Sequence, residues 1–112
     1  MLMPIIRTYS RTTRAAATLL GDLIRAARKE RGMTEQEAAD RASISRSLLK
    51  RIEKGDLKCE LGATFEVATV LGIKLFDLDE RGLNSRIRQT EEKLALLPKA
   101  VRKRNKVVND DF

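Results

Sequence analysis

The chain has 112 residues, of which 4% are aromatic and none is Trp, so one small core of Leu, Ile, Val and Ala favours an all-α fold. Lysine and arginine outnumber aspartate and glutamate by 23 to 16, and the formal charge of +7 attracts polyanions, nucleic acid first among them. The single Cys59 and the lack of histidine argue against a disulfide, a zinc site or another cofactor, and the short apolar start before Arg7 argues against a signal peptide or membrane span.

The first eleven residues are predicted to be an extended N-terminal arm. Pro4 interrupts them and their apolar residues show no helical spacing, although they could add a short strand. A long helix follows from Thr12 or Thr13 and ends at Gly32 after a cationic last turn, where basic side chains suit the negative end of the helix dipole. Its predicted inner face consists of Ala16, Leu20, Leu23, Ile24 and Ala27.

Two short helices come next, joined by the four residues ASIS. Thr34 is the expected N-cap of the first, and Glu37 three residues later completes a capping box. The second begins at Ser45 and ends at Gly55. Two helices of about two turns with so short a connection have the geometry of a helix-turn-helix. The sequence therefore predicts such a motif within one domain over residues 12–79.

A fourth helix, LGATFEVATVL, is expected to close at Gly72. Apolar residues recur along it at helical spacing, namely Leu61, Phe65, Ala68 and Leu71. The segment IKLFDLD that follows is apolar and partly alternating, so it is interpreted either as a strand or as a plug over the core. These elements would make a bundle of four to five helices.

Residues 80–97 are predicted to form a charged amphipathic helix that ends before Pro98. Its narrow apolar stripe consists of Leu83, Ile87, Leu94 and Leu97. Two interpretations of the stripe stay open: it forms the surface of a homodimer, or it packs within the chain on the fourth helix. IKLFDL is a second candidate for the dimer surface.

The third helix divides into two faces. Leu49 and Ile52 should be buried with Ile44, whereas polar and cationic residues occupy the opposite face. These are Ser47, Lys50, Arg51 and Lys54, with Arg46 at the N-terminal shoulder. A helix fits the DNA major groove, where arginine can donate two hydrogen bonds to guanine O6 and N7, and lysine suits phosphate or guanine.

Residues 20–78 resemble the phage-repressor-like Xre family of helix-turn-helix regulators. The resemblance rests on LGDLIRAARKERGMTEQEAADRASISRSLLKRIEKGD, which joins an Ile-Arg-x-x-Arg helix, an MT cap, an ISRSLL turn and an IEKG ending. It implies a lambda-repressor-like fold and a repressor that binds double-stranded operator DNA as a two-fold dimer. The DNA-binding residues that it implies, together with the neighbouring candidates, are Gln36, Ser45, Arg46, Ser47, Lys50, Arg51 and Lys54. It also implies an ion pair between Arg28 and Glu53.

The chain departs from the family pattern at three positions. Glu35 stands where a glutamine usually contacts phosphate, so we expect that contact to be lost or to pass to Gln36. Ser43 stands where a glycine with positive φ is usual, at a strain of about 1 kcal/mol. Ala38 replaces a commonly larger core residue early in the second helix, which alters the packing there.

An enzyme is not expected, because the chain has no histidine, no Gly-rich phosphate loop and no nucleophile beside a base. Cys59 is interpreted as a bystander thiol. Three kinds of binding protein remain: a stand-alone repressor, an autoregulating antitoxin, and an RNA-binding or architectural protein, which lacks the usual aromatic or GxxG signatures. The overall layout is similar to that of HipB-like antitoxins, which implies a HipA-type serine/threonine-kinase toxin as partner. We expect a cytoplasmic protein.

The tail over residues 98–112 is predicted to be flexible, basic at first and then acidic. Residues 99–106 hold five cations and no acid, a composition suited either to phosphate or to bulk solvent. Asp110, Asp111 and Phe112 instead combine negative charge with one ring, which suits a pocket on a protein with basic walls. The tail therefore carries the expected toxin-binding residues.

Overall fold

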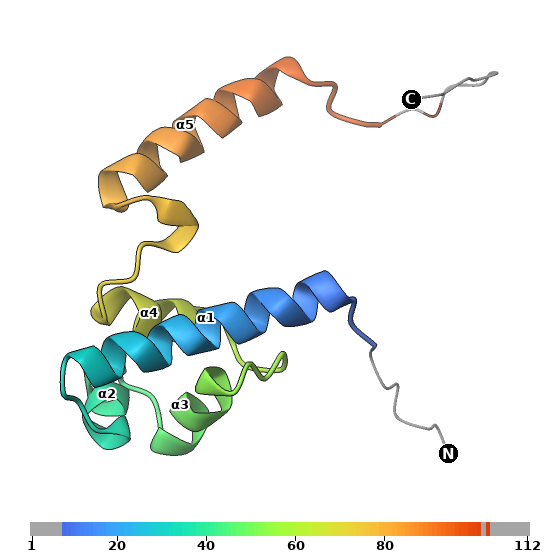
Figure 1. Ribbon diagram of the computed structural model, residues 1–112. Coiled ribbons are helices and arrows are strands. Elements are labelled where there is room, and N and C mark those ends of the chain that lie inside the picture. The colour runs from blue at the N-terminus through green and yellow to red at the C-terminus, as the bar shows by residue number, and fades with distance from the viewer. Residues whose placement is uncertain (1–7, 102, 104–112) are drawn as a thin grey trace. The chain divides into compact units, whose positions relative to one another are not determined.

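The computed structural model of the chain describes residues 8–101 and 103, and its regular secondary structure there is entirely helical (Figure 1). The all-α prediction is thus confirmed. In chain order the elements are α1 (Arg11–Glu30), α2 (Glu35–Ala42), α3 (Arg46–Glu53), α4 (Leu61–Val70), the 3-10 turn η1 (Leu75–Asp77) and α5 (Glu80–Leu96). The chain divides into two compact units, unit 1 over Met1–Asp77 and unit 2 over Leu78–Phe112.

Helix α1 begins slightly earlier than the sequence suggested. The side chain of Ser10 accepts a hydrogen bond from the backbone N–H of Thr13 at 3.2 Å, which makes Ser10 the N-cap. The predicted extended arm therefore stops at Ser10, and its residues 1–7 lie outside the described residues. The helix ends before Gly32, whose φ of 66° reverses the chain.

The core of unit 1 is made of small and branched residues drawn from all four helices. Its largest fully buried side chains are Ile24, Leu49, Val67 and Leu71. Alanines fill the space between the helices, namely Ala27, Ala38, Ala39, Ala42 and Ala68. Small side chains allow helices to approach closely, which explains how a residue as small as Ala38 is fully buried without leaving a gap in the core.

The predicted inner faces of α1 and α4 are only partly correct. Ile24 and Ala27 are buried as expected, whereas Leu23 keeps 45% of its surface exposed. On α4, Leu61 is 65% exposed and the buried position next to Ala68 is Val67. Both helices are apolar over more than one face, so spacing alone cannot tell which apolar residue turns inward.

The segment over residues 73–79 is not a strand, so that interpretation was wrong. Ile73 and Leu75 pack on the core, but the chain then makes the turn η1, in which Phe76 and Asp77 both have φ of 58°. Such left-handed residues are incompatible with a pleated strand. Ile73 and Leu75 thus cover part of the core, as the plug interpretation expected, whereas Phe76 is 77% exposed and does not.

Unit 2 consists of α5 and the residues after it. Asp79 caps the helix by accepting the N–H of Gly82 at 2.7 Å, and the helix ends before Leu97 and Pro98. None of its described residues is buried. On the predicted stripe Leu83 is half-buried, while Ile87, Leu94 and Leu97 are exposed. Asp110, Asp111 and Phe112 lie outside the described residues.

Candidate nucleic-acid interface

Local interactions fix the start of α2 and the turn between α2 and α3. The hydroxyl of Thr34 accepts the N–H of Glu37 at 3.0 Å, and the Glu37 carboxylate accepts the N–H of Thr34 at 2.8 Å, which is the predicted capping box. Ser43 ends α2 in the left-handed conformation with φ of 57°. Ser45 then caps α3 by accepting the N–H of Leu48 at 3.0 Å. The four-residue connection therefore sets the direction of α3.

Helix α3 separates a buried face from a cationic one. Leu49 is fully buried and Ile52 nearly so. The exposed residues are Arg46, Ser47, Lys50, Arg51 and Lys54. At about 100° of rotation per residue, these five side chains lie within about 140° of the helix circumference, with Arg46 and Arg51 at the two edges. The whole exposed side of α3 is thus polar and carries four positive charges.

A buried ion pair ties α3 to α1. Arg28 donates from Nε to Glu53 at 2.7 Å and from Nη2 to the other carboxylate oxygen at 3.1 Å. Its Nη1 donates to the carbonyl of Met33 at 3.0 Å, so the same guanidinium also holds the loop before α2. The hydrogen bond to Glu53 raises the pKa of Arg28. Because both side chains are more than nine-tenths buried, the pair holds α3 in a fixed position against α1, behind the exposed face.

Two further carboxylates contact the arginines at the edges of the exposed face. Arg46 Nε donates to Glu35 at 3.4 Å, and Arg51 Nε donates to Asp56 at 2.8 Å. Glu35, which stands where the resemblance implies a phosphate-contacting glutamine, therefore has an arginine partner on the next helix. The hydrogen bond to Asp56 raises the pKa of Arg51. The pKa of Asp56 is lowered, chiefly by the hydrogen bond from the backbone N–H of Lys58 and next by the one from Arg51.

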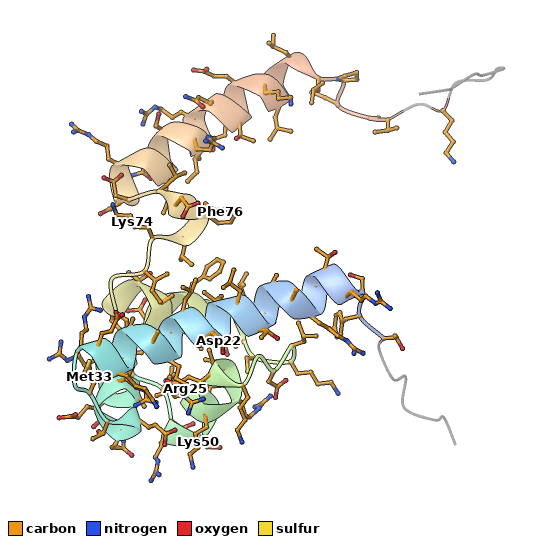
Figure 2. All side chains as sticks on the ribbon, in the orientation of Figure 1. Asp22, Arg25, Met33, Lys50, Lys74 and Phe76 are labelled. Carbon is orange, nitrogen blue, oxygen red and sulfur yellow. The ribbon has the colours of Figure 1, made fainter. Side chains whose placement is uncertain are left out.

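Sequence reasoning missed Arg25 of α1. Together with Lys50 and Lys54 it lines a hollow of about 130 Å³ whose remaining walls are Glu35 and Glu53. Figure 2 labels Arg25 on α1 and Lys50 on α3. The available signal was spacing, because Arg25 lies three residues before Arg28 and so on the same side of α1, which faces α3.

The remaining predicted residues fall in different places. Gln36 is exposed at the start of α2, where its amide donates to Asp40 at 2.8 Å. Ser47 is exposed one position after the start of α3. The stripe of α5 belongs to unit 2. Within residues 8–101, no helix combines the length and the apolar character needed to cross a bilayer.

Comparison with known proteins matches the same part of the chain. The sequence model of the helix-turn-helix domain family matches residues 19–80, which is more than half of the chain. An uncharacterized HTH-type transcriptional regulator of Methanothermobacter thermautotrophicus is 38% identical over 64 residues, covering 54% of this chain and 93% of the relative. The matched segment contains α2, α3 and the ion pair that joins α3 to α1. The chain therefore belongs to the helix-turn-helix domain family.

Proposed function

We propose that this chain is a DNA-binding transcriptional regulator that reads its operator with the exposed face of α3. One observation carries the proposal: every exposed residue of that face is polar or cationic, while the opposite face is locked to the core through Leu49 and the Arg28–Glu53 pair. A rigid short helix with an exposed cationic face fits the major groove. Arg46, Ser47 and Arg51 would contact base edges, and Lys50 and Lys54 would contact phosphate or guanine.

Residues around the start of α2 would hold the DNA backbone. The amide of Gln36 has a second N–H besides the one given to Asp40, and the hydroxyl of Ser45 can donate while its oxygen caps α3. Arg25 lies beside Lys50 and Lys54 at the hollow between α1 and α3. Contacts of this kind add affinity that falls with salt and fix the register of α3 on the duplex.

We further propose that the regulator is an Xre-type repressor that binds as a homodimer. One short helix reads few bases, so two copies on half-sites about 34 Å apart would supply the specificity. The exposed stripe of α5 supports this, since Ile87, Leu94 and Leu97 each keep half or more of their surface in water. A dimer in which two α5 helices face each other would remove that apolar surface from water.

For the biological role we propose a HipB-like antitoxin that represses its own operon and neutralises a HipA-type serine/threonine kinase by forming a complex with it. The proposal rests on the sequence layout, in which a helix-turn-helix domain is followed by α5 and by the tail with Asp110, Asp111 and Phe112. The alternative is a stand-alone repressor with no toxin partner.

The DNA claim can be tested by fluorescence anisotropy on a duplex from the promoter upstream of the gene. Arg46→Ala should weaken specific binding by about 1–3 kcal/mol, since it removes a bidentate base contact. Lys54→Ala should weaken all sequences alike and reduce the salt dependence by about one phosphate contact. Lys74→Ala is the matched control, because this exposed lysine follows α4 and lies outside α3. Equal losses in all three variants would contradict reading by α3.

The dimer and the antitoxin role need separate measurements. Sedimentation should show a dimer that Leu94→Lys converts to a monomer, whereas Gln89→Lys, on the opposite side of α5, should leave it intact. Co-expression with a neighbouring kinase-like gene should relieve that kinase's toxicity. Relief that persists after deletion of residues 109–112 would argue against the tail as the toxin-binding element, and absence of any toxic neighbour would favour the stand-alone repressor.

A further inference from the structure

Asp56, just beyond the end of α3, occupies a position set by the backbone itself. Gly55 has φ of 78° and its N–H donates to the carbonyl of Ile52 at 3.0 Å, while the N–H of Asp56 donates to the carbonyl of Arg51 at 3.1 Å. This pair of bonds is a Schellman motif, which folds the residue after the glycine back over the last turn of the helix. Asp56 is thus placed beside the side chain of Arg51.

The carboxylate of Asp56 is itself held by two donors. Its Oδ1 accepts the backbone N–H of Lys58 at 2.8 Å, and its Oδ2 accepts Arg51 Nε at 2.8 Å. One oxygen is therefore anchored to the loop and the other is aimed at the guanidinium. The side chains of Arg51 and Asp56 keep 47% and 32% of their surface exposed, so the contact sits at the edge of the cationic face.

Asp56 contacts only Nε of Arg51, so both Nη groups can donate to another partner. A guanidinium has one N–H on Nε and four on its two Nη groups. Among the described residues the hydrogen bonds of Arg51 use Nε, and neither Nη group donates to a protein acceptor. Guanine presents two acceptors, O6 and N7, to the major groove and takes both hydrogen bonds from one arginine fork.

We propose that Asp56 is a positioning residue for base recognition: it fixes Arg51 by its Nε edge, so that both Nη groups address a guanine of the operator. This inference rests on the proposed reading of DNA by α3. The long arginine side chain loses rotamer freedom when it is immobilised, and an arginine already held by Asp56 loses less of it on binding. The Arg46–Glu35 contact at the other edge is longer, at 3.4 Å, so Glu35 should fix Arg46 less firmly.

A simple electrostatic role for Asp56 predicts no change in base preference. A carboxylate close to a DNA-binding face repels phosphate, so its neutralisation should strengthen binding to every sequence. A positioning role predicts that neutralisation lowers the preference for guanine at one position while overall affinity holds or rises. The guanine preference therefore separates the two roles, because overall affinity can rise in both.

The test is selection of bound duplexes from a randomised DNA pool, followed by sequencing. Asp56→Asn removes the charge but keeps an oxygen for the N–H of Lys58, so the turn should persist. Arg51→Ala should lower the guanine preference at its position by roughly 5- to 150-fold, the loss of one bidentate contact. Asp56→Asn should lower it at that same position by a smaller factor, roughly 2- to 10-fold, the cost of ordering one long side chain. In the double variant the loss should not exceed that of Arg51→Ala.

Glu66→Gln serves as the matched control, because it makes the same charge change at an exposed position of α4. It should leave the base preference unchanged at every position, including the guanine position that Arg51 contacts. An unchanged guanine preference in Asp56→Asn, or a loss spread evenly over all positions, would overturn the positioning role. If Arg51→Ala itself changed no position, the assignment of Arg51 to base reading would fail as well, whereas an effect of Arg51→Ala alone would leave the proposed function standing.

Discussion

Replacement of Glu53 tests how much the buried Arg28–Glu53 ion pair stabilises unit 1. In Glu53→Ala, the Arg28 guanidinium loses the hydrogen bonds of 2.7 Å and 3.1 Å and keeps the one to the Met33 carbonyl, at a position where Arg28 is only 7% exposed in the native chain. Breaking a buried pair from one side costs about 3–5 kcal/mol, because the other charge is left without its partner. The free energy of unfolding of a native protein is about 5–15 kcal/mol, so unit 1 should lose a large fraction of its stability.

Urea unfolding followed by far-ultraviolet circular dichroism measures this loss. The midpoint of thermal unfolding should also fall by ~12 °C or more, at about 4 °C per kcal/mol for a domain of this size. Glu66→Ala, at an exposed position of α4, should change stability by less than about 0.5 kcal/mol. A cost below about 1 kcal/mol for Glu53→Ala would show that the buried ion pair does not stabilise unit 1.

A second variant separates stability from function. Arg28→Met combined with Glu53→Leu replaces the pair by apolar groups, which is often neutral for stability. It should recover most of the stability lost in Glu53→Ala. DNA binding should stay weak, because the two hydrogen bonds that hold α3 against α1 and the one that holds the loop before α2 to α1 are gone. Full recovery of both would show that the pair has no role in setting the register of α3.

Three other predictions follow from the backbone and from Cys59. Gly21→Ala should destabilise unit 1 by more than about 2 kcal/mol, because the added methyl group would lie 2.6 Å from the carbonyl oxygen of Ile52. Gly62→Ala should stabilise it by about 0.5–1 kcal/mol, because the nearest atom to its methyl group would be 3.7 Å away. Urea unfolding of both variants measures the difference, and equal effects of the two would contradict the prediction. Ser43→Gly should stabilise by up to about 1 kcal/mol, since it relieves the left-handed strain, and an equal or lower thermal midpoint would contradict this. Burial raises the pKa of the Cys59 thiol, so iodoacetamide at mildly alkaline pH should alkylate the native chain more slowly than the urea-unfolded chain.

The parts of the fold that were predictable are those with local hydrogen-bond chemistry. The Thr34–Glu37 capping box, the N-cap at Ser45 and the glycine at position 55 mark the ends of α2 and α3, because each satisfies backbone groups within a few residues. The inner faces of α1 and α4 were harder. Leu23 and Val67 illustrate why, since either helix offers several apolar residues and tertiary contacts select among them.

The candidate site shows the same division. The two faces of α3 follow from its periodicity, whereas the pairing of Glu35 with Arg46 joins residues on two helices and depends on the angle between them. The pairing of Asp56 with Arg51 was readable in principle, because a glycine after a helix folds the next residue back over the last turn. The left-handed turn at Phe76 was not, since no local feature favours positive φ at a bulky residue.

The most direct test of reading by α3 is methylation interference on a duplex selected by the wild-type chain. Dimethyl sulfate methylates guanine N7 in the major groove, which removes one of the two acceptors that an arginine uses. Methylation of the guanine that Arg46 contacts, and of the guanine that Arg51 contacts, should each exclude the duplex from the wild-type complex. Only the first of these exclusions should disappear with Arg46→Ala. The account is contradicted if no guanine N7 interferes, or if Arg46→Ala leaves the pattern of interference unchanged.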